Sequence, residues 1–162
     1  MEKRCLESQK RKLKHMIPID DILKADIEYT DEVIRLYKKA TKYLKSYTWC
    51  EKILNCWLAK GFGYILCIFS FEIKPIQNSC ADDKLWVIVG DLPSAYLDQV
   101  EYKTANEALD FYCFLMDEWV EHVRKGKSLK DCYPVNVAPT KEYADMLDTR
   151  TKLIRENFLP FV

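Results

Sequence analysis

The spacing of apolar residues predicts helices in the first third of the chain. A short helix is expected after Pro18, whose fixed φ suits a first helical position. From Thr30 onward, apolar residues recur every three or four positions and gather on one face of a longer helix. These residues are Val33, Leu36, Tyr37, Ala40, Leu44 and Tyr47. Another helix is expected from Thr48, because Thr48 and Glu51 have the spacing of a capping box and Gly61 is placed to end the helix.

The spacing of apolar residues then changes to two, which predicts strands. In residues 64–73 every odd position is apolar, as in a strand with one fully buried face. Residues 85–89 predict a second strand and residues 95–101 a third. A three-stranded antiparallel meander is therefore expected.

Two helices are predicted after the meander. Thr104 and Glu107 form a second capping-box pattern, which opens a helix over residues 105–125. Thr140 is the expected cap of a last helix that ends near residue 157. Elements segregated in this order predict an α+β fold, with N-terminal helices, the meander, and two C-terminal helices packed on one face of the sheet. The sheet is expected to carry helices on one side.

Length and composition predict one domain preceded by a short arm. Residues 1–16 are basic and polar and are expected to form a flexible arm, whereas residues 17–162 form a single α+β domain. The chain starts without an apolar signal region, and its longest apolar run, residues 64–71, is far shorter than the roughly 20 residues of a membrane helix. We therefore expect no membrane partner and a reduced, cytoplasmic location.

Charge and motifs argue against several kinds of chemistry. The 25 basic and 25 acidic side chains cancel, so no global field attracts nucleic acid. The two histidines lie far apart and the seven cysteines form no C-x-x-C pair, so no metal and no cofactor are expected. Gly61-Phe62-Gly63 ends a predicted helix and opens a strand, which is the reverse of a dinucleotide-binding loop. No catalytic residue is assigned on these grounds.

Cys50 is the best candidate for a nucleophile. It would occupy the first turn of the helix capped by Thr48, where the helix dipole lowers the pKa of a thiol. Neighbouring Glu51 opposes that shift, and no histidine lies near in sequence to act as a base. A structural cysteine is therefore the expectation.

Phe114 is the first of two features that suggest a binding surface. On a helical wheel it falls among Asp110, Asp117 and Glu121, on the face turned away from the core. An aromatic ring there either packs under another segment or is exposed as an anchor for a partner. The acidic surroundings would suit a basic partner, and the chain's own N-terminal arm is one candidate.

The turn at Gly90-Asp91-Leu92-Pro93 is the second feature. A glycine and a proline on either side of Asp91 predict a tight turn at the end of a buried strand, shortly before Tyr96. Asp91 either accepts hydrogen bonds from its own turn, or it is a rigidly held carboxylate at the edge of a ligand or partner surface.

Six stretches of the chain carry a resemblance to known proteins. They are Tyr47-Thr-Trp-Cys-Glu, Gly61-Phe-Gly-Tyr-Ile-Leu-Cys-Ile-Phe, Leu85-Trp-Val-Ile-Val-Gly-Asp-Leu-Pro-Ser-Ala-Tyr-Leu, Trp119-Val-Glu-His-Val-Arg-Lys-Gly, Tyr133-Pro-Val-Asn-Val and Ala138-Pro-Thr-Lys-Glu-Tyr-Ala-Asp-Met-Leu. Over about Tyr37 to Pro160 the chain resembles a family of small bacterial proteins known only as a domain of unknown function. The resemblance implies a bacterial cytoplasmic protein and supplies no catalytic residues.

Three hypotheses on function follow. The leading one is a non-enzymatic protein-binding module, of the kind found among immunity proteins of bacterial toxin systems; an exposed patch around Phe114 without a deep pocket would favour it. The alternative is a small-molecule-binding protein or an enzyme whose site near Asp91 brings together Tyr96, Glu51 and Cys50. Nucleic-acid binding comes third and would use the arm with a basic stripe of Arg35, Lys38, Lys42 and Lys45.

Overall fold

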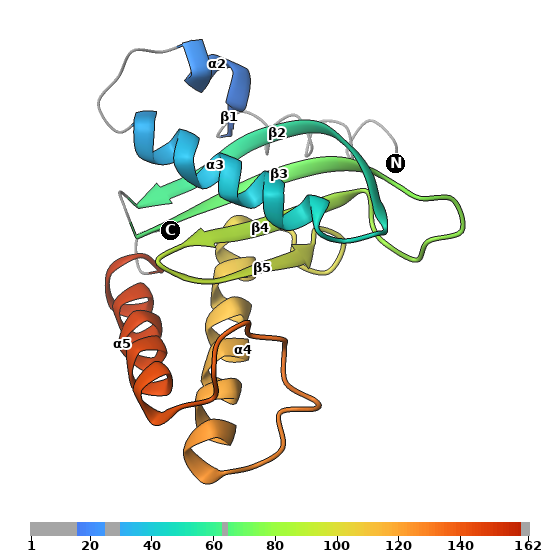
Figure 1. Ribbon diagram of the computed structural model, residues 1–162. Coiled ribbons are helices and arrows are strands. Elements are labelled where there is room, and N and C mark those ends of the chain that lie inside the picture. The colour runs from blue at the N-terminus through green and yellow to red at the C-terminus, as the bar shows by residue number, and fades with distance from the viewer. Residues whose placement is uncertain (1–15, 25–29, 63–64, 160–162) are drawn as a thin grey trace.

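The sheet contains five strands instead of the expected three. The computed structural model describes residues 16–24, 30–62 and 65–159, which form an α+β fold with antiparallel strands in the order β1 to β5 (Figure 1). In chain order the elements are β1 (Ile17–Pro18), α2 (Ile19–Lys24), α3 (Thr30–Lys45), β2 (Cys50–Phe62), β3 (Leu66–Pro75), β4 (Lys84–Gly90), β5 (Leu92–Asp98), α4 (Ala105–Lys125) and α5 (Lys141–Asn157).

The caps expected for the two C-terminal helices are present. Thr104 Oγ1 accepts a hydrogen bond from the Glu107 backbone N–H at 3.1 Å, and Glu107 Oε2 accepts one from the Thr104 N–H at 3.3 Å. Gly126 ends α4 in the left-handed conformation, with φ 63°. Thr140 caps α5 by accepting from the Tyr143 N–H. The two C-terminal helices therefore begin where their caps predict.

The helix predicted from Thr48 is wrong, because Cys50–Phe62 forms the strand β2. The pairing of β2 with β3 shifts register at three places, between Cys50 and Lys52, between Ile53 and Asn55, and between Leu58 and Lys60. Each irregularity interrupts the alternation of inward and outward side chains. As a result Cys50, Ile53 and Cys56, three positions apart, all face the same core cluster. That spacing mimics the period of a helix.

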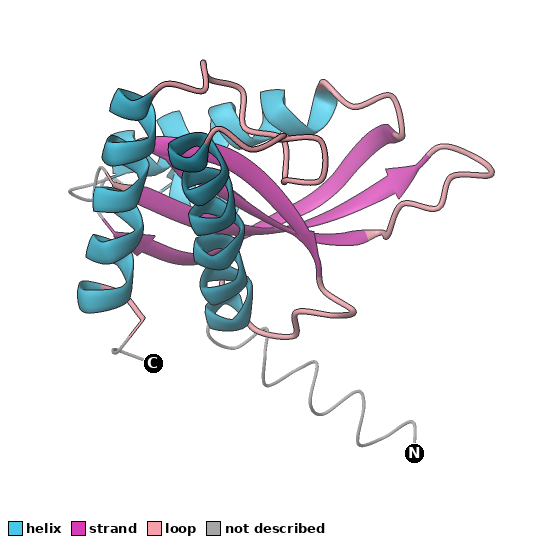
Figure 2. Ribbon diagram, turned by 90° about the horizontal axis from the view of Figure 1, so that it is seen from below, coloured by secondary structure: helices cyan, strands magenta, loops and turns pink. Residues whose placement is uncertain are grey.

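Helices cover both faces of the sheet, so the expectation of helices on one side is wrong. On one face Leu36, Ala40 and Leu44 of α3 pack against the odd-numbered residues of β3, among them Phe69 and Phe71. The helices α4 and α5 lie on the other face, in front of the strands in Figure 2. The physical reason is that both faces of β3 and β4 are apolar, and each needs a cover to exclude water.

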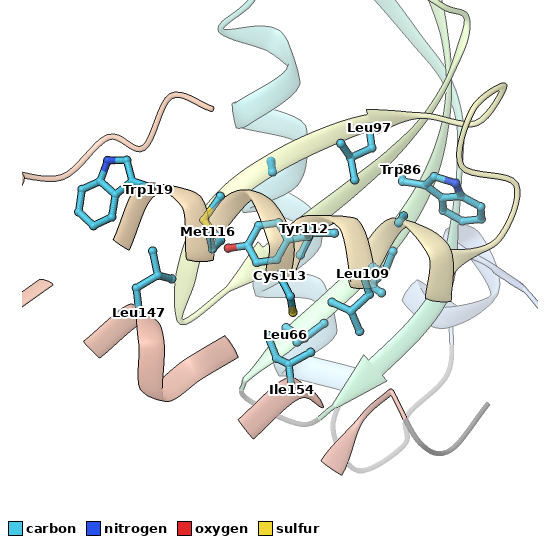
Figure 3. Packing of buried hydrophobic residues seen from close by; sticks show 14 of the residues in the cluster. Leu66, Trp86, Leu97, Leu109, Tyr112, Cys113, Met116, Trp119, Leu147 and Ile154 are labelled. Atoms are coloured by element: carbon cyan, nitrogen blue, oxygen red, sulfur yellow. The ribbon is translucent and has the colours of Figure 1, made fainter. Parts of the chain in front are cut away.

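The core beneath α4 joins the sheet to both C-terminal helices. Tyr112, Met116 and Trp119 of α4 are at most 2% exposed. Figure 3 shows them between side chains of the sheet and of α5: Leu66, Trp86 and Leu97 from the strands, and Leu147 and Ile154 from α5. The contacts of α5 are mainly with α4.

The described residues include no helix that is long and apolar enough to cross a membrane. The expected basic arm, residues 1–16, lies outside the described residues except for Met16, which packs against the core beneath α4.

The turn between β4 and β5 makes a very close contact with the segment before β3. The Asp91 backbone N–H donates to the carbonyl oxygen of Ile65 at 2.9 Å. A Cβ atom built on Gly90 would lie 2.0 Å from that same oxygen and 2.7 Å from the Leu66 Cα. Glycine is therefore required at position 90, because the contact leaves no room for a side chain.

Replacing Gly90 with alanine should destabilise the fold strongly. We expect Gly90→Ala to lower the free energy of unfolding by about 3 kcal/mol, because the backbone of Ile65 must move to admit the new methyl group. Gly126→Ala is the control: its backbone is left-handed, but nothing lies within 4 Å of the added Cβ, so a loss of about 1 kcal/mol is expected. Urea denaturation followed by circular dichroism measures both, and equal losses would contradict the close-contact explanation.

Candidate functional site

Cys50 and Glu51 lie at the start of β2 and are not arranged for catalysis. No helix begins there, so no helix dipole activates the thiol. Burial raises the pKa of Cys50, the opposite of what a nucleophile needs, although Lys45 partly offsets this. Glu51 forms an exposed ion pair with Lys74 at 3.3 Å. The expectation of a structural cysteine agrees with this environment.

Phe114 is largely exposed, which is one of the two outcomes left open by its position on the helical wheel. Its side chain is 56% exposed, and its ring stacks on Phe111 with 5.7 Å between ring centroids. Phe111 in turn stacks on Tyr102 at 4.6 Å. The three rings form a row on the side of α4, of which Phe114 is the exposed end.

Asp117 lies on the same helix, but α5 partly covers it. Its Oδ1 accepts a hydrogen bond from Thr151 Oγ1 at 2.9 Å, and its Oδ2 pairs with Arg155 at 2.6 Å. Asp117 therefore ties α4 to α5 and is not a free acidic neighbour of Phe114. The predicted docking of the N-terminal arm near Phe114 involves residues 1–15, which lie outside the described part of the chain.

Asp91 is held by α5 and lies at the edge of a cavity. Its carboxylate forms an ion pair with Arg150, and the carbonyl oxygen of adjacent Gly90 accepts a hydrogen bond from Lys39 Nζ at 2.8 Å. The turn is thus fixed by α3 from one side and by α5 from the other. Of the two interpretations of Asp91, the geometry fits the carboxylate held rigidly at a surface.

This turn forms one wall of a large cavity, which we call the α3–α5 groove. Its volume is about 1060 Å³, and its other walls are α3, the loop after α4, and α5. Much of its lining is apolar and includes Leu92, Trp119, Leu129 and Leu147. Three of its apolar residues are unusually exposed for their size: Val137 at 38%, Tyr143 at 44% and Met146 at 61%.

Three tyrosine hydroxyls form a hydrogen-bonded chain in the wall of the groove. Tyr47 donates to the Tyr43 hydroxyl at 3.1 Å, and the Tyr43 and Tyr133 hydroxyls lie 3.2 Å apart. Tyr133 accepts from the Tyr96 backbone N–H at 3.1 Å and reaches the Tyr96 carbonyl oxygen at 3.5 Å. With Tyr47 donating to Tyr43, the arrangement that satisfies every hydroxyl has Tyr43 donating to Tyr133 and Tyr133 to the carbonyl oxygen.

Tyr43 and Tyr133 are neutral in the folded protein at pH 7. Burial, followed by the presence of Tyr133, raises the pKa of Tyr43 far above its ordinary value of 10.0. Burial also raises the pKa of Tyr133. The hydroxyl groups of Tyr43 and Tyr133 therefore contribute hydrogen bonds to the groove wall and no negative charge.

The Tyr96 ring packs in the same aromatic cluster but lines a different cavity. It lies 5.1 Å from the rings of both Tyr47 and Trp49. The second cavity, of about 680 Å³, is lined by Tyr96 and Trp49 and on another side by Phe111. Tyr133 lines both cavities. Of the predicted site residues, only Asp91 lies in the larger groove.

The structure does not bring the predicted site residues together, and it adds residues that sequence reasoning missed. Lys39, Tyr43 and Tyr133 had no assigned role, and Arg150 was not considered. The sequence did contain a weak signal: five of the six stretches that carry the family resemblance contribute a residue to the α3–α5 groove. Nothing in those stretches indicates that they meet.

Metal binding finds no support in residues 16–24, 30–62 and 65–159. They contain no group of three or more His, Cys, Asp or Glu side chains that could hold a metal ion.

Comparisons of the chain with protein families, with curated proteins and with solved structures gave no match. The family resemblance therefore stays a prediction.

Removing the middle hydroxyl of the tyrosine chain should cost stability. We expect Tyr43→Phe to lower the free energy of unfolding by about 1 to 2 kcal/mol, because Tyr47 loses its acceptor and Tyr133 loses a partner. Tyr143→Phe is the matched control, since the Tyr143 side chain is exposed and should lose almost nothing. Urea denaturation at pH 7 measures both changes.

The same pair of variants should differ at alkaline pH. Because the pKa of Tyr43 is raised by folding, its contribution to stability is present below pH 10 and is lost as pH rises above 10, where the unfolded chain releases the proton. Between pH 10 and 11, wild type and Tyr143→Phe should therefore lose stability faster than Tyr43→Phe. If the free energy of unfolding fell with pH equally in all three proteins, folding would not raise the pKa of Tyr43.

Proposed function

We propose that this protein is a non-enzymatic ligand-binding protein and that a small molecule binds in the α3–α5 groove. The observation that carries the proposal is the coincidence of this cavity of about 1060 Å³ with the exposed apolar residues Val137, Tyr143 and Met146. Small-molecule sites are typically concave and mostly apolar, with a few fixed polar groups. The groove has this character.

The polar groups of the groove favour binding over catalysis. Asp91 is engaged by Arg150, and the tyrosine hydroxyls donate to one another and to the backbone. Among the described residues that line the groove there is no histidine, cysteine or glutamate. The hydroxyls of Ser46 and Thr149, which also line the groove, donate to backbone carbonyl oxygens and not to a general base.

The walls of the groove are held in place before any ligand binds. Lys39 and Arg150 fix the β4–β5 turn from two helices, and the Asp91 N–H fixes it to Ile65. Tyr133 fixes the loop after α4 to the backbone of β5. A site that is already ordered loses less conformational entropy when a ligand binds, which supports affinity.

Protein binding through Phe114 is the second candidate. The supporting observation is the row of Tyr102, Phe111 and Phe114, whose last ring is 56% exposed. Exposed aromatic side chains of this kind serve as anchors in protein interfaces. Asp117, however, is occupied by α5, so this surface is less acidic than the sequence suggested.

Nuclear magnetic resonance can test the proposed site directly. Trp119 lines the groove, whereas Trp86 lies outside it and donates its indole N–H to the Tyr102 carbonyl oxygen at 2.6 Å. When the ¹⁵N-labelled full chain is screened with a library of small organic fragments, binding fragments should shift the indole signal of Trp119 and leave that of Trp86 in place. Trp119→Phe assigns the signal.

Matched variants separate the two candidates. Met146→Ala removes an exposed side chain of the groove and should weaken fragment binding about fivefold, since most of its apolar contact is lost. Phe114→Ala removes an equally exposed side chain outside the groove and should leave the affinity unchanged. Fragment binding that responds to Phe114→Ala and not to Met146→Ala would refute the groove as the site.

A further inference from the structure

The cations of α3 differ from those of the C-terminal helices in having no acidic partners. On α4 and α5, five cations each pair with a carboxylate: Arg124, Lys125, Arg150, Lys152 and Arg155. Within the described residues, no ion pair involves the five exposed cations of α3, which are Arg35, Lys38, Lys39, Lys42 and Lys45. Of these five cations, Lys39 lines the groove.

The groove itself contains one positive charge that is not neutralised. Its charged lining residues are Lys39, Arg150 and Asp91, and Asp91 is already paired with Arg150. Lys39 donates one hydrogen bond to the neutral carbonyl oxygen of Gly90. An ammonium group has three N–H donors, so two remain for a ligand. The raised pKa of Tyr43 excludes a compensating tyrosinate.

The two cations of the groove bind to the same turn, one from each of two helices. Lys39 bonds to Gly90 and Arg150 to Asp91, which are consecutive residues of one turn. An anionic group beside this turn would meet both the free N–H groups of Lys39 and the rest of the Arg150 guanidinium. Hydrogen bonds between charged partners are about twice as strong as those between neutral ones.

We propose that the groove binds a small amphipathic organic anion, with its acidic group at Lys39 and Arg150 and its apolar body against Leu92, Trp119 and Met146. This inference rests on the proposed function and adds the chemical class of the ligand. The acidic group is a carboxylate, a sulfonate or a phosphate, since all three accept from the same two cations. The apolar body is aliphatic or aromatic, because the lining offers both kinds of contact.

Two fluorescent dyes with the same aromatic body provide the test. 1-Anilinonaphthalene-8-sulfonate carries one sulfonate, whereas N-phenyl-1-naphthylamine has the same rings and no charge. Titrations of the full chain with each dye give two dissociation constants. We expect the sulfonate dye to bind about tenfold more tightly, as one good charge-assisted contact provides.

Adjacent lysines provide the matched variants. Lys39→Met should weaken binding of the sulfonate dye about tenfold and leave the neutral dye within about twofold, because only the charged contact is lost. Lys38→Met removes an equally exposed charge from α3 outside the groove and should change neither dye. Lys39→Arg should keep the preference for the sulfonate. Thermal melts verify that each variant is folded.

The outcomes distinguish this inference from the proposed function. If Met146→Ala weakens both dyes but Lys39→Met affects them equally, the groove binds ligands and the anionic class is wrong. If Met146→Ala and Tyr143→Ala change neither dye, the dyes bind outside the groove, and both the inference and the proposed function are contradicted. A sulfonate preference that Lys39→Met abolishes and Lys39→Arg retains supports the inference.

Discussion

The backbone of Ile65 and the turn at Gly90 and Asp91 touch without any side chain between them. The hydrogen bond from the Asp91 N–H to the Ile65 oxygen, at 2.9 Å, closes the end of the sheet. It also sets the position of the Gly90 carbonyl oxygen and of the Asp91 carboxylate, to which Lys39 and Arg150 bind. The two helices that border the groove are thus both tied to this one turn. A side chain at position 90 would push the turn away from Ile65 and so disturb the positions of both helices relative to the sheet.

The groove exists because the sheet is covered on both faces. The helix α3 packs on one face, and α4 with α5 on the other, so elements from both layers meet around the β4–β5 turn. The loop after α4 closes the remaining side and is fixed by Tyr133 to the backbone of Tyr96. With helices on one face only, α3 and α5 could not border the same turn from two sides.

Local signals in the sequence predicted most elements, and long-range contacts account for what was missed. The capping pair Thr104 and Glu107 is complete within four residues, so it could be recognised directly. The strand β2 was misassigned because Thr48 and Glu51 have the spacing of a capping box. Its irregular pairing with β3, invisible without the partner strand, breaks the alternation that would have indicated a strand. The groove joins residues far apart in the chain, with separations of 51 for Lys39 and Gly90, 59 for Asp91 and Arg150, and 90 for Tyr43 and Tyr133. No spacing rule connects such residues.

Tyr133 belongs to the walls of both cavities, so a movement of its ring would change both. Its hydroxyl contacts Tyr43 on the side of the larger groove and the Tyr96 backbone beside the smaller one. A ligand that shifts the Tyr133 ring in one cavity alters the shape of the other, and by reciprocity the second occupant changes the affinity of the first by the same factor. Two separate cavities would then respond to one another through a single shared side chain.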